Sequence, residues 1–456
     1  MKRYKLPNCC LPFAFLIVLT FHSCKKLVDI SPPPNVVTTD KVFDTDASAT
    51  AATLGDYTTL SAFDTNFIPY AGQYVDELSQ PTLNITSTDF ANSSITVTNG
   101  AVASVWQDLY VTIYKANANI AGLASSKTLS DSVKNQCTGE ALFIRAYCNF
   151  NLVNLFGDVP LITTTNVSST STASRTPAAT VYNQIIADLT QAQTLLNGNY
   201  PAAEKIRPNK LAAVALLARV NLYQQNWAQS ESNATAVISS GQYPLSSLTT
   251  VFYRNSSEAI WQLWNTNGFT SLSASLVPSA SGKPSYTISS NLLGAFENGD
   301  QRQANWTKSL VVSGTTYVSP FKYKLKVVTT GTNAEYTMYL RSAEQYLIRA
   351  EARAQQNTNL TGAIADLNII RTRAGLPNLP ATLSQQQVLA AVAQERRIEL
   401  FGEGGHRFFD LKRTGTLNQV MSLVKTSWNA GRNSFYPIPE AQRTINSSLT
   451  QNPGYN

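Results

Sequence analysis

The chain has 456 residues, of which 43% are hydrophobic and 14% charged, and its formal net charge is +7. This length allows two or three domains, but no linker-like break follows residue 35, so we predict one large body. No run of Lys or Arg forms a nucleic-acid-binding patch, and we therefore expect no nucleic-acid partner. The many Ser, Thr, Asn and Gln residues predict a polar, mostly neutral surface that suits neutral polar ligands.

The N-terminus has the pattern of a secretory signal. Three basic residues among the first five precede an apolar run over residues 11–21, which is too short for a resident membrane-spanning helix. The run stops at Ser23-Cys24, and a small residue directly before a cysteine is where a bacterial lipoprotein is cut. Phe21 and His22 are unusual at such a site, so the alternative is an ordinary signal peptide with a chance cysteine.

We predict lipidation of Cys24, because a tether-like stretch follows it, with Lys25-Lys26 and then the Pro-rich residues 31–35. The chain then divides into a lipoprotein signal peptide over 1–23, a tether over 24–40 and a single domain over 41–456. Removing the signal leaves 32 basic and 28 acidic residues, a net charge of +4. An exported protein anchored to a membrane by lipid is expected.

Two further cysteines, Cys137 and Cys148, lie eleven residues apart in one predicted helix. That spacing separates them by roughly 16 Å along the helix axis. A disulfide needs Cα atoms within about 7 Å. We therefore expect both to be buried small hydrophobic residues.

Apolar residues at helical spacing predict a mainly α fold. The expected helices span 101–123, 131–156, 177–196, 210–225, 227–240, 341–356, 361–374 and 384–401. The helix over 131–156 is apolar nearly all round, which predicts burial. At the third helix, Thr176 is the expected N-cap and Pro177 the first helical residue.

Pairs of these helices, with alanines at their crossing points, resemble tetratricopeptide units, although no clean 34-residue period is present. Between residues 242 and 337 the pattern changes to short strands, such as 259–264 and 317–328, and to Gly/Ser-rich loops. The expected architecture is a tetratricopeptide-like helical scaffold with a loop-rich face.

Three long segments carry a family resemblance. The first spans 140–161 and contains R-A-Y-C-N-F-N-L-V-N-L-F-G-D-V-P, and the second joins Y-L-I-R-A-E-A at 346–352 to L-N-I-I-R-T-R-A-G at 367–375. The third spans 395–413 and is followed by Y-P-I-P at 436–439 and N-P-G-Y at 452–455. In this order the motifs resemble the SusD/RagB outer-membrane lipoproteins of Bacteroidetes, from Cys24 to the end of the chain.

The resemblance implies a surface-exposed outer-membrane lipoprotein that needs no cofactor and is not an enzyme. Family members partner a TonB-dependent, SusC-like channel, act as a lid over it, and capture glycans or, in some members, peptides. The ligand could therefore be an oligosaccharide or a peptide.

Charged residues in these signatures are interpreted as ion pairs that fix helix packing: Arg145, Glu351, Glu395, Arg396, Glu399, Arg407 and Asp410. Glu395 and Glu399 lie one helical turn apart and suggest a catalytic pair, but the flanking arginines favour charge compensation. The run Gly402-Glu-Gly-Gly405 lacks the spacing of a phosphate loop, and we interpret it as a helix terminus that follows a helix and does not precede one.

Few enzyme classes fit the chain. After residue 23 only His406 remains as a histidine, no CxxC pair exists, and no G-x-S-x-G motif is present, so we expect no metal site and no serine triad. A glycosidase needs only two suitably spaced carboxylates, and a lipid-anchored glycoside hydrolase therefore remains the alternative function.

A sugar site requires aromatic rings for the C–H faces and short polar side chains for the hydroxyls, usually on loops. Two regions, 67–92 and 264–306, interleave such residues. The predicted ligand contacts are Tyr74, Asp76, Phe90, Trp264, Phe269 and Tyr286, with Asp76 accepting hydroxyl hydrogen bonds. Trp106, Trp227 and Trp261 fit core positions, whereas Trp264 and Trp306 fit either the core or the site.

Overall fold

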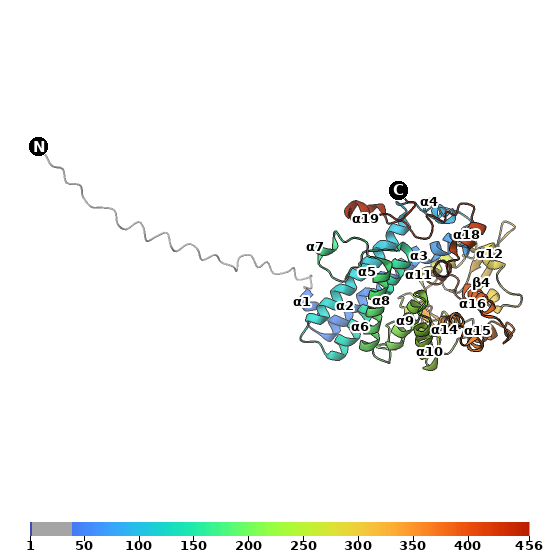
Figure 1. Ribbon diagram of the computed structural model, residues 1–456, viewed down its shortest axis with the longest axis horizontal. Coiled ribbons are helices and arrows are strands. Elements are labelled where there is room, and N and C mark those ends of the chain that lie inside the picture. The colour runs from blue at the N-terminus through green and yellow to red at the C-terminus, as the bar shows by residue number, and fades with distance from the viewer. Residues whose placement is uncertain (2–38, 456) are drawn as a thin grey trace.

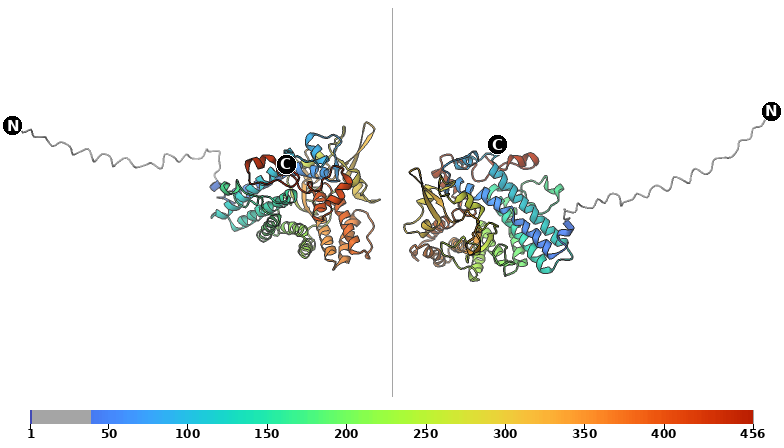
Figure 2. Two further views of the ribbon diagram at one scale, coloured as in Figure 1. Left: turned by 45° about the horizontal axis from the view of Figure 1, so that its top comes forward. Right: turned by 180° about the vertical axis from the view of Figure 1, so that it is seen from behind.

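The computed structural model describes residue 1 and residues 39–455. Residues 2–38, with the predicted cleavage site and Cys24, lie outside the described residues. Long helices stack along one side of the molecule, and the loops and short strands gather on the other (Figures 1 and 2). The chain is mainly helical, as the sequence predicts.

The long helices form a continuous series of neighbours. They are α3 (Leu60–Tyr74), α5 (Gly100–Ser125), α6 (Asp131–Phe156), α8 (Ala178–Leu195), α9 (Lys210–Tyr223), α10 (Trp227–Ser239), α14 (Ser342–Gln356), α15 (Leu360–Arg373) and α16 (Gln385–Glu399). Helix α6 packs between α5 and α8, α9 packs on α10, and α14 packs on α10, α15 and α16. The α10–α14 contact continues the tetratricopeptide-like scaffold across the long insertion between these two helices.

Shorter helices cap this scaffold and carry the loops. They are α1 (Thr39–Val42), α2 (Asp46–Leu54), α4 (Ile85–Ala91), α7 (Val167–Thr170), α11 (Ser271–Leu276), α12 (Ser290–Leu293), α13 (Gln301–Trp306), α17 (His406–Arg413), α18 (Leu417–Val424) and α19 (Glu440–Ile445), with 3-10 turns η2 (Gly55–Tyr57) and η3 (Gly331–Asn333). The predicted long helices agree with the observed bounds to within two residues.

The start of α8 differs from the prediction in its capping residue. Pro177 is the N-cap, because its backbone angles are not helical (φ −52°, ψ 137°), and Thr176 instead pairs with Val159 in an isolated β-bridge. The side chain of Asp158 accepts a hydrogen bond from the Ala178 N–H at 2.8 Å and so satisfies one of the free donors at the helix start. The G-D-V-P signature thus caps the helix that follows it.

Three two-stranded antiparallel sheets lie in or beside the insertion. Strand β2 (Ala259–Leu263) pairs with β6 (Thr337–Arg341), and β4 (Thr307–Val312) pairs with β5 (Thr315–Pro320). The β4–β5 turn is Ser313-Gly314, with φ of 51° and 80°, as a two-residue hairpin turn requires. The predicted strand over 317–328 is wrong beyond Pro320.

The third sheet joins two loop regions that are far apart in the sequence. Strand β1 (Leu78–Ser79) follows α3, and β3 (Thr287–Ile288) belongs to the insertion. Their register places Leu78 opposite Ile288 and Ser79 opposite Thr287. The early loop and the insertion therefore meet at this sheet.

Burial is deepest around α6 and strand β2. The Trp261 ring is fully buried and contacts the rings of Tyr57, Phe143, Tyr147 and Tyr339. Both cysteines of α6 are buried and unpaired, in agreement with the helix-spacing argument.

Candidate functional site

A groove of about 280 Å³ opens where the early loop meets the insertion. Its polar lining comes from the end of α3, from β1 and from the start of α12, with the end of α18 beside them. The lining residues are Gln73, Val75, Asp76, Leu78, Ser79, Gln80, Leu83, Ala91, Ser289, Ser290, Asn291, Val424 and Lys425. Hydroxyl and amide groups predominate among the polar side chains.

Both charged residues in the groove lining are already compensated. Asp76 is 3% exposed and accepts hydrogen bonds from Arg397 at 2.6 Å and from Arg407 at 2.9 and 3.0 Å. Burial raises the pKa of Asp76, but the hydrogen bonds and charges of the two arginines outweigh burial and hold that pKa below its usual value. The Lys425 amine donates to three backbone carbonyls, at 2.7, 2.9 and 3.1 Å.

Two glutamines provide hydrogen-bonding capacity at the groove. Gln73 is 2% exposed, and neither its amide nitrogen nor its amide oxygen has a partner among the described residues. The Gln80 amide oxygen is likewise buried and unpaired there. Buried polar groups are normally hydrogen-bonded, and the described residues supply no partner for these atoms.

Four of the six predicted ligand contacts are buried in this structure: Tyr74, Asp76, Phe90 and Tyr286. The Tyr74 and Phe90 rings pack edge-to-face in the core, and Tyr286 is 5% exposed. The carboxylate of Asp76 lines the groove but is occupied by its two arginines. These residues pack the early loop against the core. Aromatic residues interleaved with polar ones occur in such packed loops as well as in ligand sites, so the sequence pattern fits both.

Trp264 differs from the other aromatic candidates. Its side chain is 53% exposed, at the end of β2, while Phe269 is half-buried a few residues further on. Neither residue lines the groove. Trp306 is fully buried, with its indole N–H donating to the Leu248 carbonyl, so it belongs to the core.

The short polar residues that line the groove were not among the predicted ligand contacts. Ser79, Gln80, Ser290 and Asn291 belong to this group, and they lie within the two regions, 67–92 and 264–306, that interleave aromatic and polar residues. The β1–β3 pairing could not be predicted from strands of two residues.

The signature charges form a buried ion-pair network, as predicted. Glu399 accepts from Arg341 at 2.6 Å and from Arg302 at 3.2 Å, and it also pairs with Arg373. Glu395 accepts from Arg302 at 2.9 Å and from Arg371 at 2.7 Å. Because each carboxylate is surrounded by guanidinium groups, neither is positioned as a general acid.

Other signature residues pair in the same way. Arg145 donates to Asp188 in α8, at 2.6 and 2.8 Å, and thereby fixes the α6–α8 contact. The run Gly402–Gly405 connects α16 to α17 and has three positive-φ glycines. A Cβ at Gly405 would lie 2.4 Å from the Phe67 ring. The run is a helix terminus, but a helix also follows it directly, which corrects one part of the interpretation.

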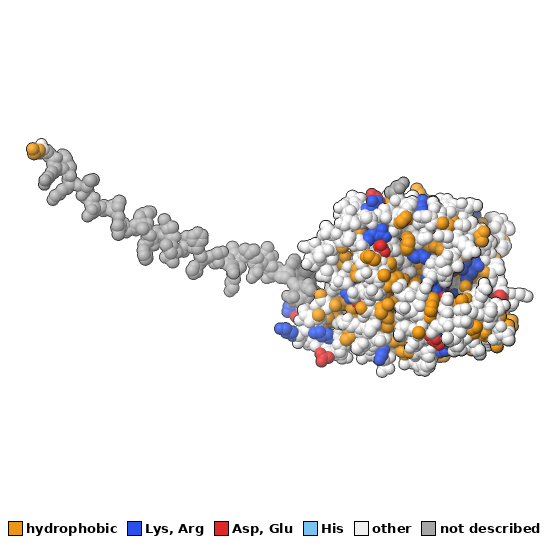
Figure 3. Space-filling model, viewed as in Figure 1, with side chains coloured by type: hydrophobic (Ala, Val, Ile, Leu, Met, Phe, Trp, Pro, Cys, Tyr) orange, Lys and Arg blue, Asp and Glu red, His pale blue; other side chains and the backbone are white. Residues whose placement is uncertain are grey.

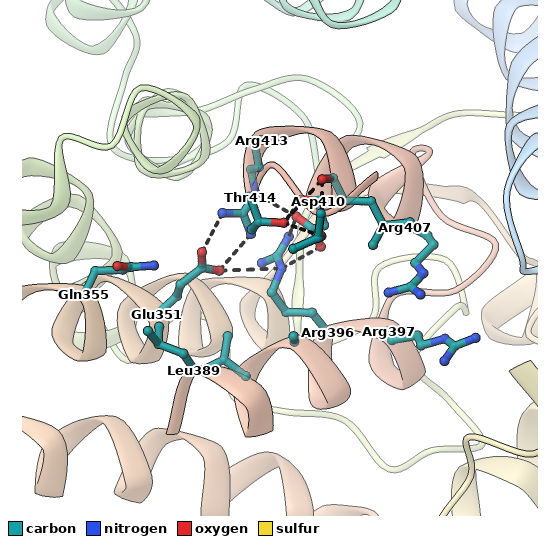
Figure 4. Close-up of a pocket in the computed structure, with 13 residues that line it drawn as sticks. Glu351, Gln355, Leu389, Arg396, Arg397, Arg407, Asp410, Arg413 and Thr414 are labelled. Carbon is teal, nitrogen blue, oxygen red and sulfur yellow. Dashed lines mark hydrogen bonds and ion pairs between the residues drawn. The ribbon is translucent and has the colours of Figure 1, made fainter. Parts of the chain in front are cut away.

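A second cavity of about 250 Å³ lies between α14, α16 and α17 (Figure 4). Arginine side chains from α16 and α17 point into this region, and Glu351 of α14 bonds to Arg413. Arg397 and Arg407 line this cavity and also hold Asp76, which lines the groove. One ion-pair cluster therefore separates the two hollows.

Within residues 39–455, no group of three or more His, Cys, Asp or Glu side chains is arranged to hold a metal ion. His406 is buried, and burial lowers its pKa to about 4.

Among the described helices, none combines the length and the apolar character needed to cross a bilayer. On the face shown in Figure 3, charged side chains are sparse and scattered.

The protein thus combines a scaffold of tetratricopeptide-like helix pairs with a groove that is built from loops. This combination is typical of a binding protein. Two family models match the chain: the SusD family over residues 257–455, and "Starch-binding associating with outer membrane" over residues 46–222. The chain belongs to the SusD/RagB family.

Individual relatives match different shares of the chain. SusD-like protein P25 of Formosa agariphila is 25% identical over 433 residues, which is 80% of this chain and 81% of the relative. A solved structure described as a laminarin binding SusD-like protein is 26% identical, with a TM-score of 0.78 over 91% of this chain and 100% of that chain. Starch-binding protein SusD of Bacteroides thetaiotaomicron is 34% identical over a shorter match, 25% of this chain and 21% of the relative.

Proposed function

We propose that this protein captures a neutral oligosaccharide at the cell surface and delivers it to a TonB-dependent, SusC-like channel in the outer membrane. The observation that carries the ligand class is the groove at the β1–β3 junction, where amide and hydroxyl side chains surround two charges that are already compensated. Neutral sugar hydroxyls both donate and accept hydrogen bonds, as these groups do.

The family supports the same class of ligand. One relative is named a starch-binding protein and another is described as laminarin binding, and these two names make starch and laminarin the first probes to use. A peptide is the second candidate, because the family resemblance includes peptide-binding members. A glycoside hydrolase is the least favoured candidate, since the carboxylates at positions 395 and 399 are both ion-paired.

Attachment to the outer membrane is proposed to depend on acylation of Cys24. The description of the matched family model associates such proteins with the outer membrane. A lipid anchor would hold the domain at the surface and leave it mobile enough to meet a channel, and the tether over 24–40 would set its reach.

The groove can be tested at its exposed polar residues. Asn291 lies on the first turn of α12 and lines the groove, whereas Asn199 is an exposed asparagine that is not part of it. Asn291→Ala should weaken binding of laminarin or starch several-fold, and Asn199→Ala should not. If Asn291→Ala and Asn199→Ala bind a glycan with equal affinity, and the wild type binds it, the groove is not the binding site.

The exposed ring of Trp264 is tested in the same way. A ring that stacks on a sugar contributes about 1–2 kcal/mol, so Trp264→Ala should weaken binding about tenfold without changing the melting temperature. Tyr114, which is 55% exposed on α5, provides a matched exposed aromatic for Tyr114→Ala. Unchanged binding by the Trp264 variant would limit the site to the groove.

A further inference from the structure

The cavity between α14, α16 and α17 has two chemically different parts. One part is apolar and includes Leu389, Val392, Ala393 and Leu411. The other part is lined by four arginines and two acidic residues: Arg396, Arg397, Arg407, Arg413, Glu351 and Asp410. An apolar wall beside a cationic wall suits a molecule that has both an apolar and an anionic end.

Positive charge exceeds negative charge around this cavity. Arg396 and Arg413 are balanced by Glu351 and Asp410, with contacts of 2.8 Å from Arg396 to Asp410 and 2.8 Å from Arg413 to Asp410. These two arginines lie within the bonded cluster in Figure 4, whereas Arg397 lies apart from it.

Arg397 and Arg407 share a single carboxylate, that of Asp76. Glu77 is the other acid beside them, and burial, together with the Asp76 charge, raises the pKa of Glu77 to about 8. Glu77 is therefore largely protonated at neutral pH, and the pair of arginines keeps a net charge close to +1.

Two of the guanidinium groups also retain unused donors. Arg396 is 2% exposed, yet its Nη1 has no hydrogen-bond partner among the residues that the structure describes. The Nε of Arg397 is likewise buried and unpaired there. A buried donor on a charged group costs free energy unless it is paired, and an anionic acceptor is the most favourable partner.

We propose that this cavity binds a small monocarboxylate that carries an apolar group. The carboxylate would lie against Arg396 and Arg397, and the apolar group against Leu389, Val392 and Leu411. Two sources share this chemistry: a short free fatty acid and the C-terminus of a peptide that ends in an apolar residue. The site is separate from the glycan groove, with the Asp76 ion-pair cluster between them.

The volume fits a short ligand. A water molecule takes up about 30 Å³ of liquid, so a cavity of about 250 Å³ holds roughly eight groups of that size. Hexanoate has six carbons and two oxygens and matches this size, while N-acetyl-leucine is a somewhat larger mimic of a peptide C-terminus.

The test uses the purified full chain and NMR titrations with four probes: hexanoate, hexanamide, N-acetyl-leucine and N-acetyl-leucinamide. Each acid and its amide have nearly the same shape, so the pair isolates the contribution of the negative charge. We expect at least one acid to bind ten or more times as tightly as its amide. Preference for hexanoate would identify a free fatty acid as the source, and preference for N-acetyl-leucine a peptide C-terminus.

A pair of variants locates the binding. Ala393 is exposed at the edge of the cavity on α16, and Ala390 is exposed on the same helix but does not line it. Ala393→Trp should reduce the affinity for the acid at least tenfold by filling the mouth, and Ala390→Trp should leave it unchanged. Equal binding of acids and amides, no saturable binding of any probe, or wild-type affinity in Ala393→Trp would overturn the proposal.

Discussion

Replacing Glu399 by Gln tests whether the C-terminal signature is structural. Glu399 is fully buried and accepts hydrogen bonds from Arg341, Arg302 and Arg373. Glutamine keeps the volume but removes the negative charge, which leaves three guanidinium groups with one carboxylate fewer. Breaking a buried ion pair in this way costs about 3–5 kcal/mol in the free energy of unfolding.

A matched control exists on α19. Glu440 pairs with Arg443 at 3.0 Å, but the two side chains are 46% and 30% exposed, and solvent screens the pair. The loss from Glu440→Gln should stay below about 1 kcal/mol, including its contribution at the helix N-terminus. Both variants change Glu to Gln in an ion pair. The difference between their losses in the free energy of unfolding therefore measures the effect of burial.

Urea unfolding of both variants at several pH values gives the assay. Burial opposes ionisation of Glu399, but the charges of Arg373, Arg341 and Arg302 outweigh it and hold its pKa well below the usual value. A depressed folded pKa gives stability that is present at neutral pH and is lost as the pH falls, so the cost of Glu399→Gln should shrink below about pH 4. A cost under 1 kcal/mol at pH 7, or lost glycan binding with unchanged stability, would refute a structural role.

Three further predictions concern the core, a buried acid and the anchor. Phe150 is 2% exposed and contacts the rings of Tyr223 and Phe409, so Phe150→Ala should cost about 3–5 kcal/mol in urea unfolding, and an unchanged midpoint would show that its packing is unimportant. Burial raises the pKa of Asp64 to about 8, so the folded state keeps a proton that the unfolded state releases above about pH 4. Wild-type stability should therefore fall relative to Asp64→Asn as the pH rises from about 4 to 8, and parallel pH profiles would contradict this. Cys24→Ser should move the protein out of the outer-membrane fraction of the cell, and if the variant fractionates there like the wild type, acylation is not the anchor.

The helices could be predicted because local rules determine them. The apolar pattern of α6 placed both ends of Asp131–Phe156 correctly, and the Asn226 break separated α9 from α10. The cap of α8 was mispredicted, because the acceptor is Asp158, twenty residues earlier, and not the adjacent threonine. A long-range cap leaves no local signal in the sequence.

The sequence singled out two regions that the structure brings together, but it did not indicate which of their side chains are exposed. Interleaved aromatic and polar residues singled out the early loop and the insertion, and the β1–β3 pairing joins these two regions. Burial could not be read from that pattern, because Tyr74 and Trp264 occur in similar surroundings in the sequence, yet one is fully buried and the other 53% exposed. Tertiary packing alone separates them.

Titration of the purified protein with laminarin and with starch, while free reducing ends are measured in the same samples, tests the proposed function most directly. We expect saturable binding of a neutral glycan with no increase in reducing ends over the uncatalysed background. Release of reducing ends would identify a hydrolase. Saturable binding of peptides, with no binding of either glycan, would assign the groove to a different ligand and contradict the proposal.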